Sequence, residues 1–147
     1  MKATGNKIIF IGNGGSAAIA SHQAIDYWKN GEIPAVAFND ASMLTCLGND
    51  YGYEYVFEKP INMFANKGDI LISISSSGKS KNIINAVKAA KKKELFVITM
   101  SGFSKLNPLR SHGDLNFYVS SNVYGHVEIT HLVFCHTILD AYLQTRL

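Results

Sequence analysis

The chain has 147 residues, of which 47% are apolar and 17% are charged, and its formal net charge is +3. This length suits one domain of ordinary size, and the composition is that of a globular protein rather than a disordered one. The Lys and Arg residues are mostly scattered, which argues against a nucleic-acid partner, and no apolar run reaches the roughly 20 residues that cross a bilayer.

Five short apolar runs have the length and the flanking residues of buried strands, and stretches with helical periodicity separate them. Ser16 is a plausible N-cap for the first helix, and Pro60 is expected to split or kink the third. In chain order the sequence predicts a strand at 7–11, a helix at 16–29, a strand at 35–38, helices at 43–47 and 53–65, a strand at 69–74, a helix at 81–93, a strand at 95–100, a short helix at 105–110, a strand at 115–119 and a helix at 125–143.

This alternation predicts an α/β fold with one domain over residues 1–147. We expect a five-stranded, mostly parallel sheet with helices on both faces, a flavodoxin-like three-layer sandwich. Four aromatic residues at helical spacing among apolar neighbours are expected in the core or at a subunit interface: Tyr27, Trp28, Phe57 and Phe134.

Cys46 and Cys135 fall within apolar helical patterns, so we expect both thiols to be buried. The first seven residues lack the apolar segment of a secretory signal. Two buried thiols without an export signal are typical of a reducing compartment, so the sequence predicts a cytoplasmic protein.

Two loops follow strands and open helices, and ligands in such sheets bind at the carboxyl ends of strands. The glycine loop, residues 12–16, reads GNGGS, and its glycines let the backbone approach a ligand beside a helix N-terminus that favours an anion. The serine loop, residues 75–80, reads SSSGKS and offers four hydroxyl groups. Together they favour a small phosphomonoester as the ligand.

Other interpretations of these loops stay open. The glycine loop fits a variant of the dinucleotide fingerprint, for which Asp40 could serve as the acidic partner. The serine loop resembles a P-loop but does not match it, because Ser73 stands where the first glycine of that motif should be. Either loop could also be a tight turn without a ligand.

Four motifs occur in the order GNGGSAA, ASH, NDYGYEYVFEK and SISSSGKSKN. Together, and at this spacing, they resemble the SIS domain of the phosphoheptose isomerases, from about residue 7 to about residue 143. The resemblance implies an aldose–ketose isomerase that converts sedoheptulose 7-phosphate to D-glycero-D-manno-heptose 7-phosphate through an enediol, for cell-surface polysaccharide. It also implies a homodimer or homotetramer, and a helical segment before the first strand that this sequence lacks.

The resemblance also implies the site residues. The catalytic positions are Asp26, Glu128 and His136, and the same three residues with His22 would hold a divalent metal, zinc first. The family usually has Glu at position 26 and Gln at position 128. The substrate positions, including Ser16 of the glycine loop, are Asn13, Gly14, Gly15, Ser16, Asn49, Asp50, Ser75, Ser76, Ser77 and Ser80.

The residues themselves support part of this metal site. His22 and Asp26 lie four apart on a predicted helix and share a face, a reasonable half-site for zinc or a similar ion. Glu128 and His136 lie eight residues apart, a rise of about 12 Å, so on geometry alone His131 would be the more compact partner of Glu128. Only the resemblance ranks His136 above it, and solvated side chains without a metal remain the alternative.

Isomerisation needs a base over a C–H bond and a group that stabilises the developing oxyanion. Asp26 or Glu128 could be the base, His136 could carry a proton between the sugar oxygens, and a metal would polarise the carbonyl. Two alternatives come from other classes of protein. One is a non-catalytic SIS module that binds a sugar phosphate for regulation or protein interaction, and the other is a dehydrogenase-like nucleotide binder.

Overall fold

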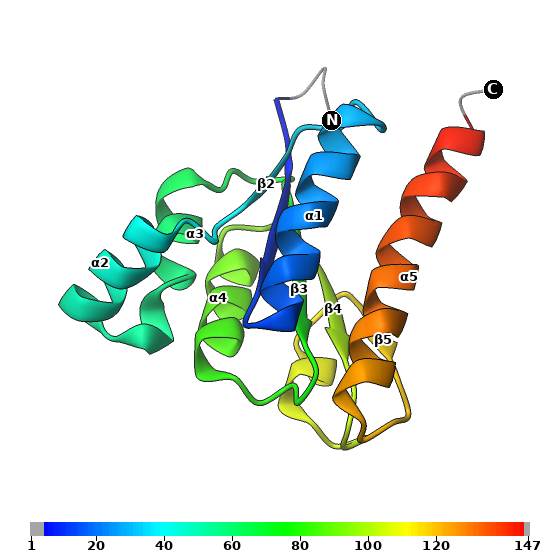
Figure 1. Ribbon diagram of the computed structural model, residues 1–147. Helices are drawn as coiled ribbons and strands as arrows, with labels where there is room; N and C mark the ends of the chain where they lie inside the picture. Colours follow the sequence, from blue (N-terminus) through cyan, green and yellow to red (C-terminus); the bar gives the residue numbers. More distant parts are fainter. Residues whose placement is uncertain (1–4, 146–147) are drawn as a thin grey trace.

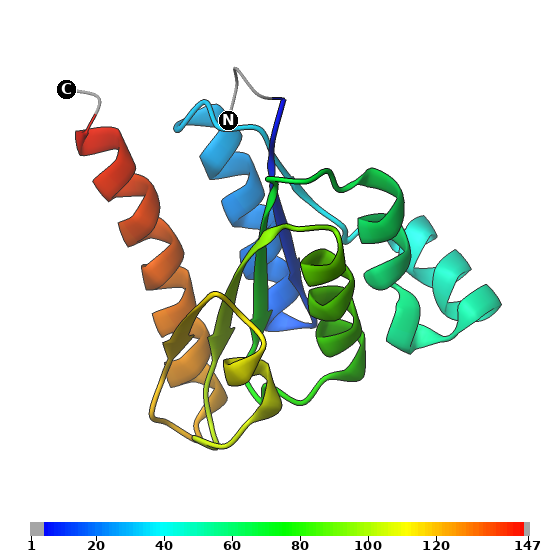
Figure 2. The same ribbon diagram turned by 180° about the vertical axis from the view of Figure 1, so that it is seen from behind.

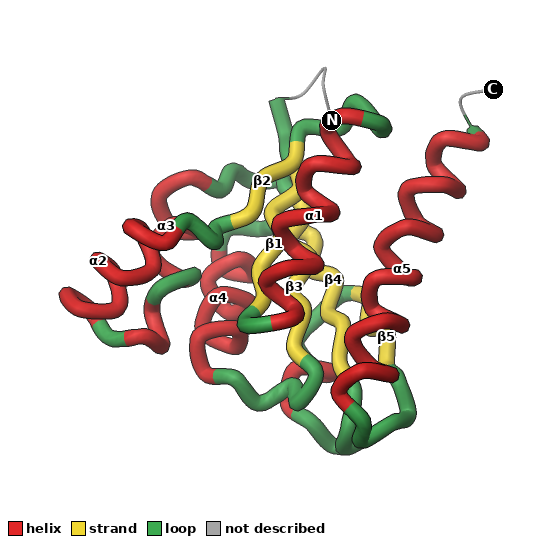
Figure 3. The backbone as a smooth tube through the Cα atoms, viewed as in Figure 1, coloured by secondary structure: helices red, strands yellow, loops and turns green. Residues whose placement is uncertain are grey.

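Strands and helices alternate along residues 5–145, the part of the chain that the computed structural model describes (Figures 1 and 3). The strands are β1 (Ile8–Gly12), β2 (Ala35–Ala37), β3 (Ile70–Ser75), β4 (Phe96–Ser101) and β5 (Leu115–Tyr118). The α-helices are α1 (Gly15–Lys29), α2 (Ala41–Tyr51), α3 (Glu58–Phe64), α4 (Lys81–Lys92) and α5 (Tyr124–Gln144), and the 3-10 turns are η2 (Tyr53–Tyr55) and η3 (Pro108–Ser111).

The five strands form one parallel sheet in the order β2-β1-β3-β4-β5. Helices α1 and α5 lie on one face of the sheet, and α3 and α4 lie on the other (Figures 1 and 2). The predicted α/β fold with both faces covered is confirmed. In this strand order the chain runs outward in opposite directions from β1 and β3, so a ligand site is expected where these two strands end.

The core is divided between the two faces because successive side chains of a strand point to opposite sides. Ile9 and Ile11 of β1 pack toward α3 and α4, while Ile8 and Phe10 pack toward α1 and α5. Both sets are buried, which explains why the strands read as continuous apolar runs rather than as alternating ones.

A buried carboxylate joins the starts of β1 and β3. Asp69 has a side chain that is 0% exposed, and it accepts hydrogen bonds from the Lys7 backbone N (2.9 Å), the Lys7 Nζ (2.7 Å) and the Asn66 backbone N (2.8 Å). Burial by itself raises the pKa of Asp69, but these hydrogen bonds outweigh it and hold the pKa below its ordinary value. The carboxylate therefore stays ionised and fixes the end of the sheet opposite to the loops.

Several predicted helix boundaries differ from the structure. The N-cap of α1 is Gly14, and Ser16 lies buried in the first turn. The predicted helix over 53–65 is interrupted between η2 and α3. Pro60 lies in the first turn of α3, where a backbone N–H would have no partner within the helix, so the N–H that proline lacks is not missed. The predicted helix over 105–110 is the 3-10 turn η3, which begins only at Pro108.

Two exposures also differ from expectation. Cys46 is exposed on α2, a helix in which no described residue is buried, whereas Cys135 is buried on α5 as predicted. Trp28 of α1 is 54% exposed, while Tyr27 beside it is buried in the core. Within residues 5–145, no helix combines the length and the apolar character that crossing a bilayer requires.

Candidate active site

The glycine loop and the serine loop meet in one cavity of about 280 Å³ at the carboxyl ends of β1 and β3. We call it the loop pocket. Its lining comes from both loops, from the end of β3 and from the first turns of α5, and consists of Asn13, Gly14, Gly15, Ser16, Ile74, Ser75, Ser76, Ser77, Ser80, Tyr124 and Glu128. Eight of the ten residues predicted to contact substrate are therefore brought together in one place.

The glycine loop bends sharply because Gly14 has φ 55°, a conformation that side chains with a Cβ rarely adopt. At Gly15 an added Cβ would lie 2.5 Å from both carboxylate oxygens of Glu128. The missing side chain at position 15 thus lets the Glu128 carboxylate of α5 reach the first turn of α1. No side chain of the described part of the chain caps that turn, so the positive end of the helix is open to a negatively charged group.

The conformation of the serine loop is stabilised by hydrogen bonds to its own hydroxyl groups. Ser75 Oγ accepts a hydrogen bond from the Gly78 backbone N at 3.2 Å, and Ser77 Oγ accepts one from the Lys79 backbone N at 3.2 Å. Ser76 Oγ is buried and has no hydrogen-bond partner within residues 5–145. Ser80 is the N-cap of α4 but makes no side-chain cap. Hydroxyls and uncapped N–H groups at a helix N-terminus form a typical site for a phosphate.

A second layer of polar residues supports the serine loop from below. Gly78 has φ 62°, and an added Cβ would lie 2.0 Å from Asn107 Oδ1. The Asn107 side chain is buried and donates to Ser101 Oγ, Gly102 O and Ser104 O. Asn107 therefore fixes the loop after β4 beneath the serine loop.

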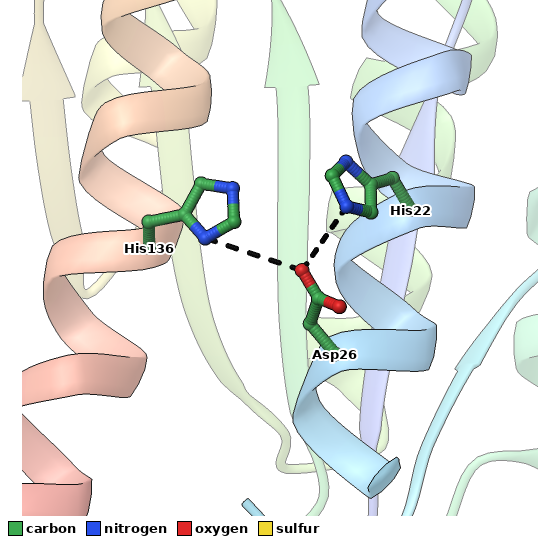
Figure 4. A group of neighbouring side chains, drawn as sticks. All are labelled: His22, Asp26 and His136. Atoms are coloured by element: carbon green, nitrogen blue, oxygen red, sulfur yellow. Dashed lines mark ion pairs between the residues drawn. The ribbon is translucent and has the colours of Figure 1, made fainter. Parts of the chain in front are cut away.

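Three potential metal ligands gather where α1 faces α5 (Figure 4). Asp26 Oδ2 lies 3.1 Å from His22 Nε2 and 4.0 Å from His136 Nδ1, and the three ligand atoms all lie within 4.8 Å of one another. Gln23 Nε2 lies 3.0 Å from His136 Nε2 and holds that imidazole from its other side. Two imidazole nitrogens and one carboxylate oxygen are a donor set that suits zinc, so these residues fit a metal of this class. We call this group the imidazole–carboxylate cluster.

Two residues of α5 that the sequence placed near the metal lie elsewhere. Glu128 is outside the cluster and lines the loop pocket instead. His131 is 0% exposed and its Nε2 lies 3.3 Å from the Ser101 carbonyl oxygen, so it belongs to the core beneath α5. Burial lowers the pKa of His131, and the bond to Ser101 opposes that shift only in part.

Asn49 and Asp50 do not line the loop pocket. Both are exposed near the end of α2, where the Asn49 side-chain amide donates to Asp50 Oδ1 at 2.9 Å. Cys46 Sγ lies 3.6 Å from Asp50 Oδ2, and this hydrogen bond raises the pKa of the thiol. Asp40, the acidic residue that a dinucleotide site would use, instead caps α2 by accepting from the Met43 backbone N.

Sequence reasoning missed Asn82 and Tyr124, two residues that shape the loop pocket. Asn82 and Tyr53 both reach the Asn13 side chain, and Tyr124 lines the pocket from α5. Asn82 follows the serine loop by two residues, so its place at the start of a helix was a usable signal. For Tyr124 the sequence holds no such signal, because tertiary packing brings it in, whereas Tyr53 belongs to the motif NDYGYEYVFEK.

Comparison with known proteins agrees with this geometry. A protein-family model described as the SIS domain matches residues 2–102. The phosphoheptose isomerase of Campylobacter concisus is 40% identical over 144 residues, which cover 93% of this chain and 75% of that protein. The phosphoheptose isomerase of Aliarcobacter butzleri is 42% identical over 142 residues, which cover 91% and 74%.

Solved structures show the same likeness. The phosphoheptose isomerase from Neisseria gonorrhoeae superposes with a TM-score of 0.88 at 36% identity, covering 95% of this chain and 78% of that one. The phosphoheptose isomerase from Francisella tularensis gives 0.89 at 31% identity, covering 97% and 78%. The likeness therefore extends over nearly all of this chain and about three quarters of the length of its relatives.

Proposed function

The chain belongs to the phosphoheptose isomerases of the SIS domain family, and from this premise we propose that it interconverts sedoheptulose 7-phosphate and D-glycero-D-manno-heptose 7-phosphate. The observation that carries the proposal is the loop pocket, in which a hydroxyl-rich loop, a glycine-rich loop and one carboxylate surround a single cavity. This arrangement offers a place for a phosphate, a sugar backbone and a base together. The relatives are named as enzymes, which does not favour the non-catalytic alternative.

The phosphate is assigned to the serine loop. Among the described residues Ser76 Oγ has no hydrogen-bond partner and no side chain caps the start of α4 at Ser80, so both a hydroxyl and backbone N–H groups are available to phosphate oxygens. Asn13, Gly14 and Gly15 would then lie along the sugar hydroxyls. Asn49 and Asp50 stay proposed contacts on the resemblance alone, and they would reach the sugar from the end of α2.

Proton transfer between the two carbons is assigned to Glu128, because it is the carboxylate that lines the loop pocket. His136 lies eight residues further along α5, a rise of about 12 Å, and is proposed to carry protons between the oxygens of the same two carbons, which requires both side chains to extend toward one place on the sugar. Asp26 would then hold the two imidazoles in place, since its carboxylate lies between them.

The imidazole–carboxylate cluster is proposed to hold a divalent metal, with zinc as the first candidate. His22, Asp26 and His136 would supply its ligands. When bound, such an ion polarises a carbonyl oxygen and stabilises developing negative charge on it. The chain's own contribution is to fix the imidazoles, which Asp26 and Gln23 do by direct contact.

The assignment of the base can be tested by exchanging two side chains. The family usually has Glu at position 26 and Gln at position 128, whereas this chain has Asp26 and Glu128. If Glu128 is the base, Glu128→Gln lowers kcat by about 10²–10⁴-fold, and the double variant Asp26→Glu with Glu128→Gln recovers turnover. Full activity of the single variant would show that the base is elsewhere.

The reaction itself is tested with purified protein and sedoheptulose 7-phosphate in deuterated water, followed by NMR. An enediol route gives the aldose phosphate with solvent deuterium at C2, because the abstracted proton exchanges before it returns. Binding of the sugar phosphate without any product would point to the non-catalytic module instead. Stabilisation by NAD and not by the sugar phosphate would support the nucleotide binder.

A homo-oligomer is proposed as the working assembly, since large apolar side chains are exposed on the layer formed by α1, β2 and α5. Ile25 and Trp28 are 49% and 54% exposed, and with Val36 they line a surface concavity of about 430 Å³. Ile129 and Val133, one turn apart on α5, are 64% and 52% exposed. A second copy of the chain would cover these surfaces, and light scattering of wild type against Trp28→Glu measures whether it does.

The domain and cellular context are proposed on the same basis. We place one SIS domain over residues 1–147, acting in the cytoplasm on a small phosphorylated sugar for cell-surface polysaccharide. The free thiols Cys46 and Cys135 agree with a reducing compartment. Fractionation of cells that produce the protein tests the location.

A further inference from the structure

One side of the loop pocket is aromatic. Tyr124, the first residue of α5, lines the cavity and is 61% exposed. Its ring meets the ring of Phe103 edge to face, with centroids 4.8 Å apart and planes at 80°. The rest of the lining is backbone, hydroxyl and amide groups, one carboxylate and Ile74, so Tyr124 is the large apolar surface among these residues.

Phe103 is held in a conformation that costs energy. Its φ is 57°, in the left-handed region that bulky residues seldom occupy, at a cost of about 1–3 kcal/mol. The surroundings fix it there, because its backbone N donates to Ser121 O at 2.9 Å and its carbonyl accepts from Tyr118 Oη at 2.8 Å. An ordinary turn would place glycine or asparagine here, so the strain at Phe103 points to a role for its ring.

The same short segment also supports the serine loop. Gly102, the neighbour of Phe103, donates its backbone N–H to Ser76 O at 2.9 Å. An added Cβ at Gly102 would lie 2.8 Å from both methyl groups of Val127, so this segment is pressed against the first turn of α5. Consecutive residues thus position the phosphate-binding loop on one side and the Tyr124 ring on the other.

We propose that Tyr124 is a specificity-determining residue, which packs its ring against the carbon chain of the bound sugar phosphate, and that Phe103 is the positioning residue that holds this ring. The proposal rests on the proposed function only in the identity of the ligand. An aromatic face suits the C–H groups of a sugar, and such a contact contributes binding without selecting one hydroxyl pattern. Tyr124 would therefore favour a sugar phosphate over inorganic phosphate, which needs only the serine loop.

Calorimetric titration tests the ring contact directly. Tyr124→Ala is expected to weaken binding of sedoheptulose 7-phosphate about tenfold while leaving binding of inorganic phosphate unchanged, and Tyr124→Phe to stay within about threefold of wild type. In the turnover assay the same loss appears in KM with kcat unchanged, since the contact is equal in substrate and transition state. Phe64→Ala is the matched control, because Phe64 is also exposed and ring-paired, with Phe38, but does not line the pocket.

Phe103→Gly separates positioning from stability. Glycine adopts φ 57° without strain, and this gain offsets part of the lost ring packing and of the added freedom of the unfolded chain, so this variant is expected to unfold near the wild-type temperature and yet to raise the dissociation constant of the sugar phosphate severalfold. A merely structural role predicts the reverse, a loss of stability with binding unchanged, and that result overturns the proposal for Phe103.

Other outcomes are equally decisive. The proposal for Tyr124 is overturned if Tyr124→Ala binds the sugar phosphate as tightly as wild type. It is also overturned if Tyr124→Phe loses as much affinity as Tyr124→Ala. In both cases turnover by the wild type would leave the proposed function intact. Wild type that binds the sugar phosphate but yields no product contradicts the proposed function, and the titrations still decide on Tyr124. Wild type that binds the sugar phosphate no better than inorganic phosphate overturns both.

Discussion

The side-chain amides of Asn13 and Asn82 bind each other in both directions. Asn13 Nδ2 donates to Asn82 Oδ1 at 3.0 Å, and Asn82 Nδ2 donates to Asn13 Oδ1 at 2.8 Å. Asn13 belongs to the glycine loop, and Asn82, which is buried, lies in the first turn of the helix that follows the serine loop. This pair ties together the two halves of the loop pocket across the end of the sheet.

Asn82→Leu is expected to lower the free energy of unfolding by about 1–3 kcal/mol, because it removes two of the hydrogen bonds to the Asn13 amide and leaves the one from Tyr53. It should also raise KM, since the two loops lose their fixed spacing. Urea denaturation and the turnover assay measure the two effects. Asn85→Ala, one turn further along α4, removes an exposed bond to Glu54 O and serves as control; equal effects of both variants would contradict a special role for Asn82.

The imidazole–carboxylate cluster predicts a metal content that depends on named residues. Protein loaded with zinc and then dialysed is expected to retain about one ion per chain, and His22→Ala or His136→Ala to lose most of it. His112→Ala, outside the cluster, should bind as wild type does. Elemental analysis gives the ratio, and zinc retained by both cluster variants would show that any bound ion lies elsewhere.

Gly78→Ala is expected to lower the free energy of unfolding by about 2–4 kcal/mol, from the left-handed φ and from overlap with the buried Asn107 side chain. Gly125→Ala is the comparison, because a Cβ there meets nothing within 4 Å and alanine is the better helix former. Thermal and urea unfolding of the two variants should move in opposite directions or leave Gly125→Ala unchanged. A small effect at position 78 would mean that the serine loop tolerates another conformation.

Asp69 predicts how stability depends on acidity. Its pKa is held below the ordinary value of 3.8, so the folded state binds this proton less readily than the unfolded chain. The stabilisation is present in full above that ordinary value and is lost as pH falls through the lower pKa of the folded state. Asp69→Asn should remove this part of the acid dependence and cost about 1.5–3 kcal/mol at neutral pH. Unfolding curves at pH 7 and at decreasing pH down to 3 measure both, and an unchanged acid slope would contradict the assignment.

The middle of the sheet was predictable because β1 and β3 are buried on both faces. Residues 7–11 and 69–74 are apolar runs without alternation, and the structure has β1 and β3 within a residue of those bounds. Helix ends were less predictable because caps depend on contacts outside the helix. Ser16 suits an N-cap by type, but the sharp turn at Gly14 starts the helix earlier and leaves Ser16 inside.

The loop pocket was predictable in its two loops and not in its remaining walls. Glycines and serines at strand ends carry a local signal, since the backbone conformation there demands those residue types. The meeting of Glu128 with Gly15, or of Tyr124 with Phe103, joins segments far apart in the chain and leaves no pattern in either segment. The same holds for His131, whose polar side chain on a helix gave no hint that β4 covers it.

The bare Cα at Gly15 beneath the Glu128 carboxylate has a consequence for anyone redesigning this protein. Positions 15 and 128 share one small volume, so a side chain at position 15 requires the flexible end of Glu128 to move away from the start of α1. The methyl group of an alanine at position 15 would displace the Glu128 carboxylate, whereas an aspartate at position 128 would leave room for that methyl group. Randomising both codons together, and scoring them as a pair, is the search that this geometry recommends.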